Sequence, residues 1–100
     1  MINETQKSVV ENSAFITLVT LNPDGTAHPI IAGKADVQGD KLIFGIYKME
    51  TTQKNLAANA AAWVVAATMD GGPKGFRFAG SAVVDGKSLI FTVTNAEALI

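Results

Sequence analysis

Short runs of β-branched and aromatic residues, separated by glycine-containing turns, recur along most of this chain. The runs are AFITLVTL (14–21), AHPIIAGKADV (27–37), KLIFGIY (41–47), AAWVVAATM (61–69), FRFAGSAVV (76–84) and SLIFTVT (88–94). Such residues favour β-strands, and the intervening NPDGT, QGD, DGGPKG and DGK segments favour tight reversals. Six short strands joined largely by hairpins predict a mainly β fold, a closed or partly closed antiparallel barrel.

Two segments between these runs are predicted to be helical. Residues 2–12 form a short amphipathic pattern in which Ile2, Val9 and Val10 supply an apolar face, with Asn3 or Thr5 near the start. Residues 52–60 are rich in alanine and predict a helix that crosses over between the third and fourth strands. Gly80, inside the fifth run, predicts a bulge or a close approach of two backbones.

Composition excludes several classes of function. The formal net charge of −1 argues against duplex binding, and with few aromatic residues it also disfavours a barrel that binds single-stranded nucleic acid. The chain has no cysteine and one histidine, which argues against a metal site or a cysteine nucleophile. The polar start and the lack of an apolar run near the roughly 20 residues of a membrane span predict a cytoplasmic protein without a membrane partner.

The apolar content bears on domain organisation and assembly. With 100 residues, the chain suits a single domain that spans residues 1–100. Hydrophobic residues make up 48% and charged residues 17%. Because large apolar patches rarely stay exposed on monomers, this surplus favours a homodimer.

Four motifs resemble a known family when they are taken in order. They are NPDGTAHPII (22–31), FGIYKMETTQKNL (44–56), GFRFAGSA (75–82) and FTVTNAEAL (91–99). Together they resemble the FMN-binding split-barrel family, the pyridoxamine 5'-phosphate oxidase-like fold, and most of all its small bacterial FMN-binding members. The resemblance runs from about Ser13 to Ile100. It implies a six-stranded antiparallel split barrel with a short N-terminal helix and one crossover helix, and a homodimer with FMN at the interface.

The resemblance also implies which parts of the chain meet the cofactor. The strand after the first hairpin would run beside the flavin ring, the start of the crossover helix would bind the phosphate, and the C-terminal tail would approach from the partner subunit. The corresponding residues are Ile31, Ala32, Gly33 and Lys34 for the ring, Glu50, Thr51, Thr52 and Asn55 at the helix start, and Ala98 to Ile100 in the tail. Met49, just before the helix, and Lys54, within it, flank the same place and are also candidate cofactor-binding residues.

A helix start suits a phosphate because its N–H groups are unpaired and carry a partial positive charge. The family usually adds a basic residue here, but this chain has Thr51 at that position and an acid, Glu50, before it. The cation that a phosphate wants must then come from elsewhere. Lys54 and Lys34 rank ahead of Lys48 and Arg77 as candidates.

Each of these residues also has a simpler interpretation. Thr51 and Thr52 suit the N-cap of a helix. Trp63 suits core or interface packing, and His28 suits a solvated position at a hairpin edge. Arg77 lies between two phenylalanines on a predicted strand and suits either the surface or a phosphate.

The resemblance implies a homodimeric flavoprotein that binds FMN without covalent attachment. No side chain is an evident general base, so the expected chemistry is electron transfer or a simple flavin-dependent oxidoreductase reaction with an unknown redox partner. The alternative is a non-enzymatic barrel dimer that has lost or repurposed the flavin site, and the missing basic residue supports it. The sequence leaves open whether the chain is an enzyme.

Overall fold

The computed structural model describes residues 2–100. Two helices and seven strands follow one another along the chain. They are α1 (Glu4–Asn12), β1 (Ile16–Leu21), β2 (Ala27–Gly33), β3 (Ala35–Gln38), β4 (Lys41–Gly45), α2 (Glu50–Ala58), β5 (Ala61–Thr68), β6 (Lys74–Asp85) and β7 (Ser88–Ala98). The mainly β class is confirmed.

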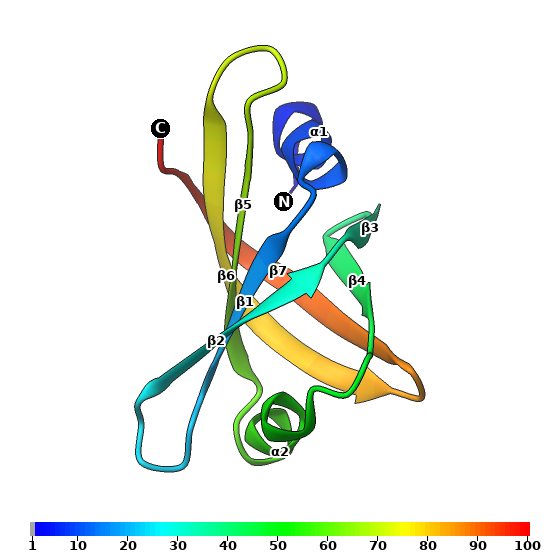
Figure 1. Ribbon diagram of the computed structural model, residues 1–100, viewed down its shortest axis with the longest axis vertical. Coiled ribbons are helices and arrows are strands. Elements are labelled where there is room, and N and C mark those ends of the chain that lie inside the picture. Colours follow the sequence, from blue (N-terminus) through cyan, green and yellow to red (C-terminus); the bar gives the residue numbers. More distant parts are fainter. Residues whose placement is uncertain (1) are drawn as a thin grey trace.

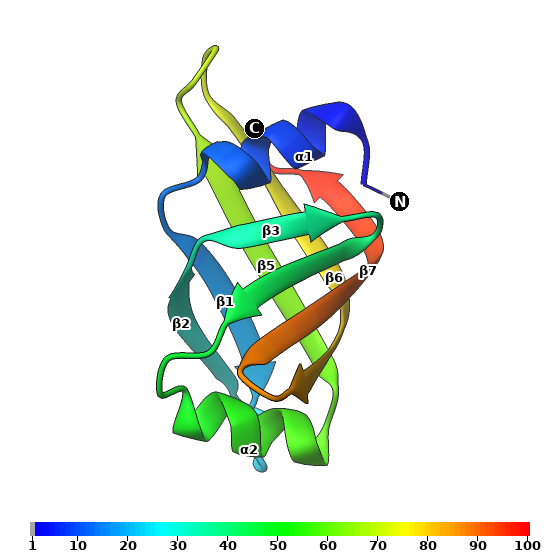
Figure 2. The same ribbon diagram turned by 90° about the vertical axis from the view of Figure 1, so that its right-hand side faces the viewer.

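All seven strands belong to one antiparallel sheet in the order β2-β1-β5-β6-β7-β4-β3. The sheet curls on itself, so that β3 and β4 lie across from β1 and β5 (Figures 1 and 2). α1 covers one end of the curled sheet and α2 covers the other (Figure 2). Within residues 2–100, neither helix has the length and apolar character that a membrane span requires.

The predicted count of six strands is wrong, because residues 27–37 form two strands instead of one. Gly33 has a φ of 82°, a conformation that glycine adopts at little cost, and the chain bends there. Before the bend β2 pairs with β1, and after it β3 pairs with β4. One segment therefore supplies both edge strands of the curled sheet, which explains why its sequence resembles a single long strand.

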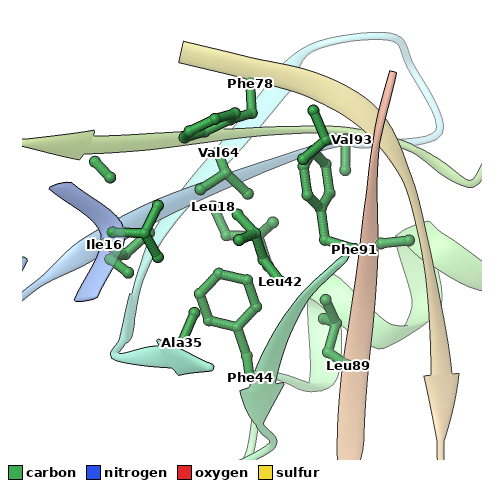
Figure 3. Close-up of a cluster of buried hydrophobic side chains, with 14 of the residues drawn as sticks. Ile16, Leu18, Ala35, Leu42, Phe44, Val64, Phe78, Leu89, Phe91 and Val93 are labelled. Atoms are coloured by element: carbon green, nitrogen blue, oxygen red, sulfur yellow. The ribbon is translucent and has the colours of Figure 1, made fainter. Parts of the chain in front are cut away.

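The hydrophobic core lies on the inner face of the curled sheet (Figure 3). Phe44, Phe78 and Phe91 come from three different strands and are fully buried, as is Leu18 on β1. Burial of each such side chain contributes about 1.5–3 kcal/mol. The sheet is therefore held in its curled shape by side chains that meet from opposite walls.

The predicted irregularity at Gly80 is confirmed. The register between β6 and β7 shifts between Ala79 and Gly80. A Cβ placed on Gly80 would lie 1.9 Å from the main-chain oxygen of Thr92. Only glycine therefore allows the two backbones to approach this closely.

The N-terminal helix follows local rules closely. Asn3 is its N-cap, and a capping box joins Asn3 and Gln6: the Gln6 N–H donates to Asn3 Oδ1 at 2.8 Å, and the Asn3 N–H donates to Gln6 Oε1 at 3.0 Å. Val9 and Val10 are buried against the core. The predicted apolar face of this helix is confirmed, and the helix begins at Glu4.

Candidate functional site

The start of α2 differs from the prediction in a way that matters for any ligand. The helix begins at Glu50, two residues before the predicted start, and its N-cap is Met49. Lys48 and Met49 both have positive φ, 67° and 55°, a conformation that residues other than glycine, asparagine and aspartate rarely adopt. No side chain among the described residues caps the helix, so the interpretation of Thr51 and Thr52 as an N-cap is wrong. The first N–H groups of α2 keep their capacity to bind an acceptor.

The two threonines differ in their exposure to solvent. Thr51 is exposed, whereas Thr52 is fully buried against the end of the barrel. Within residues 2–100, Thr52 Oγ1 has no hydrogen-bond partner. Such a buried, unpaired hydroxyl costs about 1–3 kcal/mol. Thr51 is thus the threonine that a solvent-borne ligand meets directly.

Asn55 faces inward beside Thr52. It is 3% exposed, and its Nδ2 donates to Thr20 Oγ1 at 3.1 Å and to Asn22 Oδ1 at 3.0 Å. Both amide protons are therefore used inside the protein. Leu56, the next residue, is also buried in the core cluster, so this face of α2 holds the helix on the barrel.

The charges around the helix start fit a phosphate only in part. Glu50, Lys48 and Lys54 are all exposed. Across residues 2–100, Lys34, Lys48 and Lys54 form no ion pair. Lys48 and Lys54 flank the helix start, whereas Lys34 lies at the bend between β2 and β3. Glu50 in the first turn stabilises the helix dipole but would repel an anion. The donor set of free N–H groups, Thr51 and a flanking lysine is suited to the phosphate of FMN.

The ring-side residues lie at the bend between β2 and β3. Ile31 is 62% exposed on the outer face, while Ala32 packs against the core from the inner side. Thr20, which contacts Asn55, pairs with His28, and Thr17 pairs with Ile31. Three residues of strand therefore separate the two groups, about 10 Å along the sheet. The structure does not bring them into contact, and a ligand that touched both would have to be elongated.

The C-terminal residue lies elsewhere on the molecule. Ile100 is 73% exposed and follows β7, whose last residues pair with the start of β6. The Leu99 N–H donates to the main-chain oxygen of Gly75 at 2.9 Å. The strands β1, β5 and β6 lie between β2 and β7, so Ile100 does not meet the β2 residues within one chain.

Arg77 is engaged on the outer surface. Its Nε donates to Glu97 Oε1 at 2.7 Å, and its Nη2 lies 2.6 Å from the same oxygen. Both side chains are about half exposed. Because the guanidinium already pairs with a carboxylate, Arg77 is a poor source of the missing phosphate cation.

The outer face of the sheet carries a group of apolar side chains, with Thr17 and Arg77 among them, that the sequence did not place together. Residues of β1 and β5 alternate between the core and this face. Two rows cross four strands in register: Pro29, Val19, Trp63 and Ala79, then Ile31, Thr17, Val65 and Arg77. In the sequence, this surface was indicated by the apolar residues that alternate with the core residues of β5, such as Trp63 and Val65. Ile31 is 62% exposed, and Val19, Trp63 and Val65 are half-buried.

A surface hollow of about 280 Å³ lies between α2 and β6. It is lined by Gln53, Leu56, Ala57, Val83 and Val84. It is largely apolar and lies on a different side of α2 from Thr51. The predicted cofactor residues do not line it.

The turn between β1 and β2 is ordered by its own side chains. The Thr26 hydroxyl donates to Asp24 Oδ1 at 2.6 Å, and the Thr26 N–H donates to the same oxygen at 3.0 Å. These two bonds favour the ionised form and lower the pKa of the exposed Asp24 carboxyl below its ordinary value.

Comparison of the sequence with family models and with curated proteins finds no match. Comparison of the structure finds clear ones. HupZ of Group A Streptococcus superposes with a TM-score of 0.83 at 16% identity, over 99% of this chain and 94% of that chain. A Lactobacillus delbrueckii protein provisionally assigned as a pyridoxamine 5'-phosphate oxidase gives 0.81 at 15% identity, over 96% and 93%. An FMN-binding protein from Syntrophomonas wolfei gives 0.76 at 14% identity, over 94% and 83%.

The chain has the fold of these proteins. The likeness covers 94–99% of this chain and 83–94% of theirs. It supports the split-barrel fold that the four sequence motifs imply in its coarser form, a mainly β, curled antiparallel sheet with two helices, although the sheet has seven strands and not the predicted six. At these identities the likeness is one of fold, and a shared fold hosts many functions.

Proposed function

We propose that this protein binds FMN without covalent attachment, as a homodimer, and uses it for electron transfer or a simple flavin-dependent oxidoreductase reaction. The observation that carries the proposal is the start of α2. It offers unpaired N–H groups, an exposed Thr51 and unpaired lysines at one place, on a fold shared with an FMN-binding protein.

The proposed site uses residues in different ways. Thr51 and the first N–H groups of α2 would bind the phosphate, and Lys54 would balance its charge. Thr52 and Asn55, which are buried, would support the helix from behind. Met49 is partly buried against the core beside the helix start and would border the same site.

The bend between β2 and β3 would receive the other end of the cofactor. Ile31, Ala32, Gly33 and Lys34 lie there, and Gly33 leaves room because nothing lies within 4 Å of an added Cβ. Ile100 would contribute from the partner subunit. When bound, FMN itself supplies the redox chemistry of its ring, while these residues orient it and exclude water.

The outer apolar face supports the homodimer. One of its two rows ends at the Arg77–Glu97 ion pair, and the other ends at Ala79, which pairs with Asn95, so an apolar centre meets a polar margin. Interfaces between subunits commonly have this arrangement. Ile31 lies both on this face and beside the proposed ring site, which would place the cofactor at the edge of the subunit interface.

A visible absorption spectrum of the purified protein tests the cofactor. We expect the absorption bands of an oxidised flavin, or quenching of flavin fluorescence when FMN is added to the colourless protein. We also expect Lys54→Glu to weaken FMN binding more than Lys7→Glu, a matched change on α1 at the opposite end of the barrel. Colourless protein that leaves FMN fluorescence unchanged would refute the flavin proposal.

Light scattering during gel filtration tests the dimer. We expect Ile31→Glu to produce monomers, whereas Val83→Glu, a change at a similarly exposed aliphatic residue (56% against 62%), leaves the dimer intact. A wild-type monomer would contradict the homodimer.

The second candidate is a barrel dimer that does not use flavin. The observations that favour it are the exposed Glu50 at the first position of α2 and the internal hydrogen bonds of Asn55. A dimer by light scattering that fails to bind FMN, FAD or riboflavin would select this function over the first.

A further inference from the structure

A directed chain of hydrogen bonds joins the buried face of α2 to the exposed turn between β1 and β2. Asn55 Nδ2 donates to Asn22 Oδ1 at 3.0 Å and to Thr20 Oγ1 at 3.1 Å. Asn22 Nδ2 donates to Thr26 Oγ1 at 3.0 Å, and the Thr26 hydroxyl donates to Asp24 Oδ1 at 2.6 Å. Every bond runs in the same donor-to-acceptor direction and the chain ends on a carboxylate. Bonds arranged in this way polarise and strengthen one another.

This series of hydrogen bonds holds α2, a helix whose start is stabilised by few local contacts. Two residues with positive φ precede α2, and no side chain in the described part of the protein caps it. Each such residue costs roughly 1–2 kcal/mol. One local bond offsets part of this cost, because Gln53 Nε2 donates to the main-chain oxygen of Lys48 at 2.8 Å. Contacts elsewhere must supply the rest.

Asn55 is the polar contact on the inner face of α2 that can do so. The inward residues of the helix are Thr52, Asn55 and Leu56. Leu56 packs without directional bonds, and Thr52 Oγ1 is unpaired within residues 2–100. The two bonds from Asn55 are directional, and they fix the placement of the helix on β1 and the turn that follows it. The N–H groups of a helix point along its axis, so this placement determines where the first N–H groups of α2 point.

We infer that Asp24, Thr26, Asn22 and Asn55 form a positioning relay, by which the exposed β1–β2 turn sets the orientation of the α2 N-terminus and thereby its affinity for a phosphate. The inference rests on the proposed function in so far as the phosphate is that of FMN. None of the four residues touches the ligand in this scheme. They act through the helix.

Titrations with FMN and with riboflavin, which lacks the phosphate, test the relay. We expect Asp24→Ala and Asn22→Ala each to weaken FMN binding about threefold or more, the scale of coupling through such networks. Riboflavin binding should stay unchanged, because only the phosphate contacts the helix start. Asp24→Asn keeps an oxygen that accepts from Thr26 and should recover most of the affinity.

The matched control is Asp70→Ala. Asp70 also precedes a glycine in an exposed turn, but this turn joins β5 and β6 and lies at the opposite end of the barrel from α2 (Figure 2). It should leave both affinities unchanged. Equal losses for FMN and riboflavin in the Asp24 variant, or no loss for either, would overturn the relay.

Amide hydrogen exchange on the flavin-free protein tests the relay independently of the cofactor. In Asp24→Ala, we expect faster exchange in α2 and unchanged exchange in α1. If wild-type protein binds no flavin but exchange in α2 rises, the proposed function fails and the relay stands. If flavin binds and exchange in α2 matches wild type, the relay fails and the proposed function stands.

Discussion

The buried hydroxyl of Thr52 makes a prediction that can be worked out from the structure. Thr52 is fully buried and, within residues 2–100, its Oγ1 has no partner. Thr52→Val replaces the hydroxyl by a methyl group of similar shape and removes an unpaired polar group. The desolvation penalty of about 1–3 kcal/mol is then recovered, while helix propensity hardly changes. We expect the free energy of unfolding to rise by about 1–2 kcal/mol.

Urea unfolding of the flavin-free protein, followed by circular dichroism, measures this change. A gain of 1 kcal/mol corresponds to about 4–8 °C in Tm for a domain of this size. Thr20→Val is the matched control, because Thr20 is equally buried but its Oγ1 accepts a hydrogen bond from Asn55. We expect that change to destabilise by about 1 kcal/mol or more.

The opposite signs of two identical substitutions test the reasoning directly. If Thr52→Val destabilises as much as Thr20→Val, the Thr52 hydroxyl is satisfied and the argument is refuted. If Thr52→Val is more stable but binds FMN less tightly, the hydroxyl is retained for the ligand at a cost in stability, a common exchange at functional sites.

Three further predictions concern stability. Gly80→Ala should destabilise by more than about 3 kcal/mol, because its Cβ has no room beside β7. Gly45→Ala, where a Cβ has open space, should change the urea midpoint little. Similar effects of the two substitutions would contradict the close approach of the backbones at Gly80. Asn3→Ala should cost about 1 kcal/mol and lower Tm, since it removes the capping box of α1, and an unchanged Tm would mean that the cap is not stabilising. The lowered pKa of Asp24 adds stability at neutral pH that is lost as pH falls below about 4. The free energies of unfolding of wild type and Asp24→Ala should therefore converge on acidification. A constant difference down to low pH would contradict this.

The strands were predictable because their turns are local. Asp-Gly and Pro-Asp-Gly segments impose reversals within a few residues, and the runs between them favour strands by composition alone. The division of residues 27–37 was not predictable in this way. It depends on β2 and β3 choosing partners at opposite edges of the sheet, which is a long-range property, and Gly33 was its only local sign.

The candidate site was predictable in position but not in orientation. The sequence placed Thr51, Thr52 and Asn55 near the start of a helix, and the helix is there. The helix begins two residues earlier than predicted, and on it Thr51 is exposed whereas Thr52 and Asn55 are buried. That start follows two residues with positive φ, which no local rule favours, so only the packing of α2 on the barrel determines which side chains a ligand meets.

The two helices of this fold form an internal comparison that bears on function. Each has nine residues and covers one end of the same barrel (Figure 2). α1 has a complete capping box and buries Val9 and Val10, as stability alone would favour. α2 has no side-chain cap within the described residues, a strained start and a buried hydroxyl without a partner. Departures from local rules concentrate where a protein meets a functional demand. Because both helices solve the same packing problem, the contrast supports our proposal that the functional demand lies at the start of α2 and not at the other end of the barrel.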